Sequence, residues 1–319
     1  MREIRVTDIA GITIGQVENV SAGTGCTVFI SLEGMSAGID VRGGGPASRE
    51  SELLNPLASA QEIHAVVLAG GSAFGLDTAG GVMRCLEEHA IGFDVGVTRV
   101  PLVVQSCLFD LTVGNKNIRP DSVMGYEAAK IALESPNYKD GNHGAGTGAT
   151  VGKFAGMDTC MKSGIGSYAV QIGELQVGAV VAVNALGDIF DWRTGKKLAG
   201  LTTGDTTELM MQNYAPINNK FTGNTTLAVV MTNAYFTKSQ LCKIAGMSQD
   251  GLARSIRPVH TSADGDTVYA LSAGSIQADM DLVGTLAAEV VSEAITRAVT
   301  SCEGAYNFPS YKDISSREE

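Results

Sequence analysis

The chain has 319 residues, a formal net charge of −11, 44% hydrophobic residues and 18% charged residues. Binding to nucleic acid depends on clustered Lys and Arg, so this acidic balance without any basic run argues against a nucleic-acid partner. The composition instead predicts a globular protein with a large core, in which 39 glycines indicate many tight turns.

The cysteines and the apolar runs bear on metal binding and on location. None of the six cysteines belongs to a CxxC pair, which favours reduced thiols over disulfides or a zinc site. The apolar runs at 64–71 and 177–187 are too short to span a bilayer, and residues 1–15 lack a signal-peptide pattern. We therefore expect a cytoplasmic protein with no metal, no other cofactor and no membrane contact.

The N-terminal half alternates strand-like and helix-like segments. Strands are expected at 26–32, 37–44 and 64–71. The last of these leads into a helix at 77–90, and a second helix is expected at 122–135 with Ser122 as its N-cap.

The glycine-rich segment 137–156 invites comparison with a phosphate-binding loop. A Walker loop needs a glycine five positions before the glycine of its Gly-Lys pair and Ser or Thr after the pair, but Thr147 and Phe154 occupy those positions. Residues 144–149 fit a loose GxGxxA pattern, yet no strand-like run precedes them and no helix-like run follows. The segment therefore does not predict a nucleotide site.

The C-terminal half repeats the mixture of strands and helices. Strands are expected at 168–172, 176–184, 226–234 and 267–272. A helix begins at Thr237, which forms a capping box with Gln240, and a long helix covers 281–301. Residues 191–224 resemble a long surface segment, and 311–319 a polar tail. This order fits one layered αββα domain as well as two domains.

Asn224 and Thr225 stand at the start of the apolar strand. A threonine that becomes the first residue of a chain can use its own α-amine as the base that activates its hydroxyl. Such a terminus arises when the hydroxyl attacks the preceding carbonyl, here that of Asn224, in an N-to-O acyl shift followed by hydrolysis. Gly223 would supply the permissive turn for this step. Taken alone, the same residues also suit an ordinary turn and strand start.

Further polar residues suit the same chemistry. Asp264 and Asp266 can share a site, which would raise the pKa of one of them, although a solvated Asp-Gly turn fits too. Lys153 and Asn184 are lone polar residues in apolar or glycine-rich surroundings. This pattern fits a buried charge at Lys153 and an oxyanion donor at Asn184, and it also fits two ordinary surface residues. His260 is expected to pack or cap rather than act as a base.

In combination these segments resemble the L-aminopeptidase/D-esterase (DmpA-type) family, which includes β-aminopeptidases and nylon-oligomer hydrolases. The resemblance runs through nearly the whole chain. Its motifs are 70–88, 100–111, Gly223-Asn224-Thr225-Thr226 with the strand behind it, Thr232-Asn233, 251–254, and 258–267 with Pro258-Val259-His260-Thr261 and Asp264-Gly265-Asp266-Thr267.

The resemblance implies an α/β (α+β) fold of one domain over 1–319, a four-layer αββα sandwich like that of DmpA and ornithine acetyltransferase. It implies self-cleavage into fragments 1–224 and 225–319 that stay together, and a homotetramer of the processed unit. Thr225 would be the nucleophile and Asn224-Thr225 the cleaved bond. Lys153, Asn184, Asp264 and Asp266 would complete the catalytic site, with Gly71, Ser72 and Phe109 as substrate-pocket candidates.

Two departures place the chain within the family. Many relatives cut at Gly-Ser and carry Ser and Glu where this chain has Asp264 and Asp266, so the likeness is to the threonine branch. Phe109 stands where the nylon hydrolases have a tyrosine, and the missing phenol hydroxyl changes a polar contact near the pocket.

The function implied is an amidohydrolase or aminopeptidase that hydrolyses small peptides, amino-acid amides or oligomers through an acyl-threonine. Two alternatives remain open from the sequence. One is an acyltransferase, in which an amine rather than water resolves the acyl-enzyme. The other is a catalytically silent relative that binds a small molecule.

Overall fold

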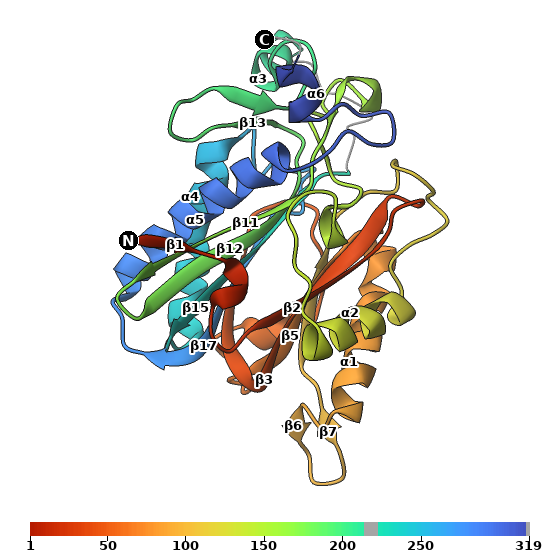
Figure 1. Cartoon of the computed structure of the whole chain (residues 1–319). Helices are drawn as coiled ribbons and strands as arrows, with labels where there is room; N and C mark the ends of the chain where they lie inside the picture. Colours follow the sequence, from red (N-terminus) through yellow and green to blue (C-terminus); the bar gives the residue numbers. More distant parts are fainter. Residues whose placement is uncertain (214–222, 317–319) are drawn as a thin grey trace.

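Two β-sheets pack face to face, and helices cover the outer side of each sheet (Figure 1). The computed structural model describes residues 1–213 and 223–316. The first sheet has, in order, β1 (Arg2–Ile4), β11 (Ile165–Ile172), β12 (Leu175–Asn184), β15 (Thr225–Ala234), β17 (Thr267–Ile276) and the second half of β3 (Thr24–Val41). Its neighbours are antiparallel except β15 and β17, which run parallel.

The long strand β3 belongs to both sheets. Residues 24–30 pair with β2 (Thr13–Asn19) and β5 (Ile63–Ala69), whereas 36–41 pair with β17. The register shifts between Ile30 and Met35, where Gly34 has a left-handed φ of 86°. The separate strands expected at 26–32 and 37–44 are thus one bent strand, because pairing continues on both sides of the shift. The second sheet continues from β5 to β8 (Val103–Cys107) and β4 (Ala47–Arg49).

Four long helices form the outer layers (Figure 1). α4 (Lys238–Ser255) and α5 (Met280–Thr300) pack on the first sheet, and α1 (Thr78–Glu88) and α2 (Ser122–Glu134) pack on the second. These four helices confirm the expected ones. The capping of α4 is confirmed by the Thr237 amide, which donates to Oε1 of Gln240 at 2.9 Å.

The N-cap of α2 differs from the expected Ser122. Oδ1 of Asp121 accepts the amides of Val123 and Met124, both at 3.0 Å, so Asp121 is the cap and Ser122 is the first helical residue. A carboxylate at this position also interacts favourably with the helix dipole.

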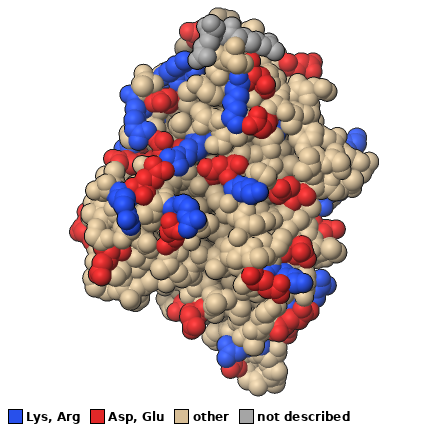
Figure 2. Space-filling view, in the orientation of Figure 1, with Lys and Arg blue, Asp and Glu red and all other residues tan. Residues whose placement is uncertain are grey.

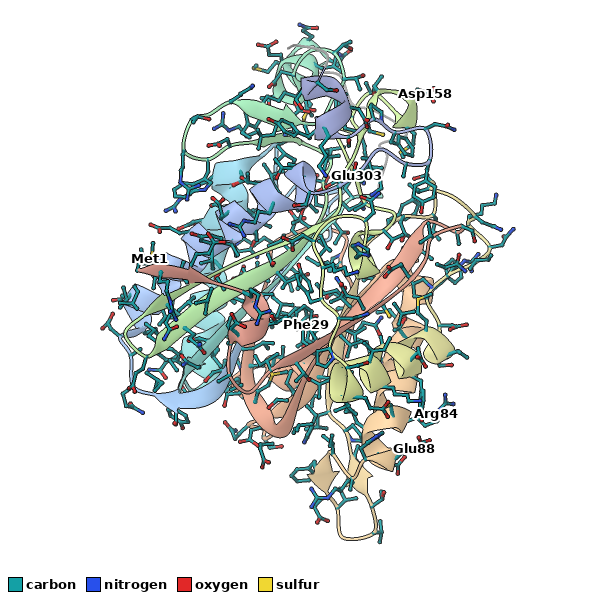
Figure 3. All side chains as sticks on the ribbon, viewed as in Figure 1. Met1, Phe29, Arg84, Glu88, Asp158 and Glu303 are labelled. Carbon is teal, nitrogen blue, oxygen red and sulfur yellow. The ribbon has the colours of Figure 1, made fainter. Side chains whose placement is uncertain are left out.

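Three apolar layers follow from this arrangement, one between the sheets and one beneath each pair of helices. Phe29, labelled in Figure 3, lies between the two sheets. All ten residues of β15 are buried. Leu227, Val229 and Met231 face the other sheet, and the alternate Ala228 and Val230 face α4 and α5. A strand covered on both sides needs apolar residues on both faces, which explains the uninterrupted apolar run at 227–231.

Short elements occupy two segments expected to be irregular. The part 191–224 contains β14 (Lys197–Ala199) and α3 (Thr206–Gln212), while its residues 214–222 lie outside the described part. The expected tail at 311–319 begins with a short helix, α6 (Tyr311–Ser315), and 317–319 lie outside the described part. The remaining strands are β6 (Phe93–Asp94), β7 (Arg99–Val100), β9 (Thr150–Val151), β10 (Met161–Lys162), β13 (Asp188–Phe190) and β16 (Ile256–Arg257).

The surface carries charges of both signs. On the face shown in Figure 2, Lys and Arg lie among Asp and Glu. Among the described helices, none combines the length and apolar character needed to cross a membrane.

Candidate active site

Thr225 is the first residue of β15, the strand that lies between β12 and β17 in the first sheet. Its side chain is buried, and its register partner on β12 is Asn184. The preceding residue, Asn224, forms a parallel bridge with Asp264 just ahead of β17. The Asn224-Thr225 bond is therefore held by strand pairing on both sides.

The Thr225 hydroxyl meets the carbonyl of the bond that would be cut. Oγ1 of Thr225 lies 2.5 Å from the Asn224 carbonyl oxygen, and the Gly265 amide donates to that same oxygen at 3.0 Å. A fixed backbone donor on a carbonyl oxygen is what stabilises the negative charge of a tetrahedral intermediate. Gly265 also leaves room for the hydroxyl, because a Cβ there would lie 2.6 Å from Oγ1.

The glycine at 223 has a different role from the turn that its sequence suggests. Neither Gly223 nor Asn224 has a left-handed backbone. A Cβ on Gly223 would lie 2.4 Å from Cδ1 of Phe109, so the Phe109 ring occupies the space of a side chain. Glycine is required here for close packing.

Lys153 is buried beside the bond. Its Nζ donates to the Gly223 carbonyl at 3.1 Å, to the Asn184 carbonyl at 3.0 Å and to Oδ1 of Asn184 at 2.5 Å. Burial lowers the pKa of Lys153 to about 7, while the nearest acidic groups oppose this shift. A group with this pKa changes its charge near neutral pH.

Asn184 ends β12 and links Lys153 to the second sheet. Its Oδ1 also accepts the Thr150 amide at 3.1 Å. Its Nδ2 donates to the Phe109 carbonyl at 2.9 Å and, more weakly, to the Gly223 carbonyl at 3.4 Å. In the uncut chain the amide therefore holds the main chain one residue ahead of the bond, whereas Gly265 holds the Asn224 carbonyl itself.

The two aspartates lie on opposite sides of Gly265 and both are buried. Oδ2 of Asp264 accepts the Thr261 amide at 2.6 Å, and Oδ1 of Asp266 accepts the Thr226 amide at 2.7 Å. Burial raises the pKa of Asp264, and the charge of Asp266 raises it further. The expected electrostatic coupling of the two carboxyls is present.

His260, expected only to pack or cap, contacts Asp266 directly. Its Nδ1 lies 2.9 Å from Oδ2 of Asp266, and its amide donates to the same oxygen at 3.1 Å. The sequence signal was the short spacing between His260 and the aspartates, but spacing alone does not show which way a loop side chain turns.

The three pocket candidates lie along the end of the second sheet. The Gly71 amide donates to Oδ1 of Asp110 at 2.7 Å, and the Ser72 amide to the Leu108 carbonyl at 2.9 Å. Phe109, between Leu108 and Asp110, reaches Gly223. The structure thus connects Gly71 and Ser72 to the Thr225 region through one short stretch of chain.

Asp110 is a buried carboxyl that the sequence did not single out. Its Oδ2 accepts the Thr24 hydroxyl at 2.6 Å. Burial raises the pKa of Asp110 to about 6, although its hydrogen bonds to Thr24 and Gly71 act in the opposite direction. Its position directly after Phe109 was the available signal.

Within residues 1–213 and 223–316, no group of three His, Cys, Asp or Glu side chains is arranged to hold a metal ion. The chemistry available here is that of a buried hydroxyl, a lysine, two carboxyls, and amide donors.

Comparison with known proteins shows the family of this chain. Residues 5–308 match the model of peptidase family S58. An uncharacterized aminopeptidase of Mycobacterium leprae is 36% identical over 338 residues, covering 96% of this chain and 92% of the relative. A 6-aminohexanoate-oligomer endohydrolase of Agromyces is 28% identical over 320 residues, covering 93% of this chain and 86% of the relative.

The fold also has a solved counterpart. The L-aminopeptidase D-Ala-esterase/amidase of Ochrobactrum anthropi, described as a variant of the Ntn hydrolase fold, superposes with a TM-score of 0.67 at 16% identity. The match covers 98% of this chain and 92% of that one. The four-layer fold is therefore that of an Ntn hydrolase. The chain belongs to peptidase family S58, the DmpA-type family, and is a hydrolase of the aminopeptidase and amidase kind.

Proposed function

We propose that the chain is the precursor of an N-terminal-nucleophile aminopeptidase, which cuts itself between Asn224 and Thr225. The observation that carries the proposal is the approach of the Thr225 hydroxyl to a carbonyl whose oxygen already accepts the Gly265 amide. Thr225 is the nucleophile in both self-cleavage and substrate hydrolysis.

Self-cleavage proceeds in two steps. Oγ1 of Thr225 attacks the Asn224 carbonyl carbon, the amide C–N bond breaks, and the hydroxyl proton ends on the Thr225 nitrogen, leaving an ester between Asn224 and Oγ1. Water then hydrolyses the ester to an Asn224 carboxylate and a free hydroxyl. The Gly265 amide stabilises the oxyanion, and Lys153 holds the Gly223 carbonyl in place.

The same hydroxyl then acts on substrate. The new α-amine of Thr225 takes the proton of Oγ1, since α-amines have a pKa near 8 in peptides. The acyl group of the substrate transfers to Oγ1, the leaving amine takes the proton, and water releases the acid. Asn184 is freed from the Gly223 carbonyl by the cut and donates to the substrate oxyanion. Asp266 holds the strand start through the Thr226 amide, Asp264 holds the loop through the Thr261 amide, and the two carboxyls supply negative charge near the amine.

The substrates proposed are small peptides, amino-acid amides or short oligomers with a free amino end. This rests on family membership and on the aminopeptidase and oligomer-hydrolase names of the two relatives. Gly71, Ser72 and Phe109 line the acyl pocket in this proposal. Fragments 1–224 and 225–319 stay together through the shared sheet, and the processed unit forms a cytoplasmic homotetramer.

The test uses wild type, Thr225→Ser and Thr225→Ala with a panel of aminoacyl-p-nitroanilides. Wild type should hydrolyse at least one L, D or β substrate without added metal, Thr225→Ser should retain part of that rate, and Thr225→Ala should have none. Equal rates in wild type and Thr225→Ala would refute the assignment. Adding amine acceptors separates hydrolysis from acyl transfer, because a transferase forms the amide product at the expense of the acid.

A further inference from the structure

We propose that His260 is a positioning residue, which orients the Asp266 carboxylate and through it the start of the nucleophile strand. The inference rests on the proposed function, because it concerns the site at which Thr225 would react. His260 lies in the loop between β16 and β17, six residues before Asp266.

The Asp266 carboxylate is shared between two parts of the chain. Oδ1 accepts the Thr226 amide, directly after Thr225, whereas Oδ2 accepts both the amide and Nδ1–H of His260. Asp266 is 2% exposed, so water does not replace these donors easily. His260 thus fixes one end of a carboxylate whose other end holds Thr226.

The hydrogen bonds define the tautomer of His260. Both oxygens of a carboxylate are acceptors, so Nδ1 carries the proton. Nε2 is buried and has no hydrogen-bond partner among the described residues. A buried ring nitrogen without a partner costs about 1–3 kcal/mol, so packing alone is a poor reason for histidine at this position. The donor that it offers to Asp266 is the feature that an apolar side chain would lack.

The backbone of His260 leads to the same conclusion. Its φ of 57° is left-handed, a conformation uncommon for residues other than Gly but tolerated by Asn, Asp and His. The amide and the ring nitrogen of this one residue converge on a single carboxylate oxygen in this conformation. The loop is therefore built around the contact to Asp266.

The neighbouring charge explains why two donors are needed. Asp264 lies two residues away, and its pKa is raised partly by the charge of Asp266, so the two carboxyls repel each other when both are ionised. Without the ring donor, Asp266 keeps one amide on Oδ2 and can rotate away from Asp264. The Thr226 amide would then lose its acceptor, and Thr225 would lose its alignment with the Asn224 carbonyl.

The experiment compares two variants that fit the left-handed backbone. His260→Asn keeps an N–H donor at the position of Nδ1, and His260→Gly removes the donor without backbone strain. We expect His260→Asn to stay within about threefold of wild type in the self-cleavage rate and in kcat. His260→Gly should lose at least about tenfold in both, with KM nearly unchanged, because a hydrogen bond to a charged group is lost. Equal rates in the two variants, or losses that only track the unfolding midpoint, would overturn the proposal.

A second measurement does not depend on activity. In a Thr225→Ala background, crystal structures of His260→Asn and His260→Gly show the uncut chain. Oδ1 of Asp266 should remain within hydrogen-bond distance of the Thr226 nitrogen with Asn and move away with Gly. An unmoved Asp266 in His260→Gly contradicts the positioning role. If wild type neither cuts itself nor hydrolyses substrate, the proposed function fails, while this comparison still decides the role of His260.

Discussion

Nζ of Lys153 lies 3.1 Å from the carbonyl oxygen of Gly223, the residue just ahead of the proposed cleavage pair. This contact joins a buried charge to the main chain that must stay still while the Thr225 hydroxyl attacks. Two of the three acceptors of Lys153 have another donor, since Oδ1 of Asn184 accepts the Thr150 amide and the Gly223 carbonyl accepts Nδ2 of Asn184.

Lys153→Met should therefore separate catalysis from stability. We expect self-cleavage to slow by about tenfold or more, because a charge-assisted hydrogen bond is lost. The midpoint of thermal unfolding should be unchanged or higher, because a buried ammonium is costly and two of its three acceptors keep another donor. The rate is followed by intact mass and the midpoint by calorimetry. Wild-type cleavage in Lys153→Met would contradict the role given to this lysine.

Gly223→Ala should destabilise the chain, because its Cβ would lie 2.4 Å from Cδ1 of Phe109. Overpacking of this kind costs about 1–3 kcal/mol, a loss that urea unfolding would measure. In a Phe109→Ala background, which lacks the ring, Gly223→Ala should cost much less stability than it does in wild type. Phe109→Ala alone is the control. If Gly223→Ala costs as much stability in the Phe109→Ala background as in wild type, the ring is not what requires glycine.

Asp110→Asn should change how stability depends on pH. Burial raises the pKa of Asp110 from 3.8 to about 6 in the folded chain. A raised folded pKa adds stability that is full below about pH 4 and is lost as pH rises through 6. The asparagine side chain carries no such charge. The free energy of unfolding of the variant should therefore rise relative to that of wild type by up to about 3 kcal/mol as the pH goes from 4 to 7.

The measurement is urea unfolding at several pH values, with the exposed Asp250→Asn as a control for net charge. Asparagine keeps an oxygen for the Gly71 amide, and the Thr24 hydroxyl can accept from the new amide group. Parallel curves for wild type and Asp110→Asn would show that Asp110 does not ionise in a buried site.

The sequence predicted the layers better than the contacts at their edges. Apolar periodicity locates β15 and α5, because strands and helices buried on defined faces impose it on every residue. It did not reveal that β3 bends through Gly34 to serve both sheets, since a bulge keeps the alternation of a strand on each side. Ser122 was expected as the cap of α2, but Asp121 is the cap; both residue types cap helices well, and only the backbone decides between them.

For the site, residue types and the order of the motifs predicted that Thr225, Lys153, Asn184 and the two aspartates belong to one catalytic site. The role of the Gly265 amide as a donor could not be predicted from residue type, because every residue except proline has a backbone N–H. His260 and Asp110 were missed because their importance lies in which neighbour they face. The structure adds those orientations, which depend on contacts between segments far apart in the sequence, as between Asn184 at the end of β12 and Phe109 after β8, 75 residues away.

The central claim is that Thr225 cuts the chain ahead of itself. Intact mass spectrometry of the purified wild type, Thr225→Ser and Thr225→Ala tests it most directly. The account predicts two fragments, 1–224 and 225–319, in wild type and more slowly in Thr225→Ser, and one 33.1 kDa chain in Thr225→Ala. An uncut 33.1 kDa chain in wild type as well, or a cut at the same bond in Thr225→Ala, would contradict it.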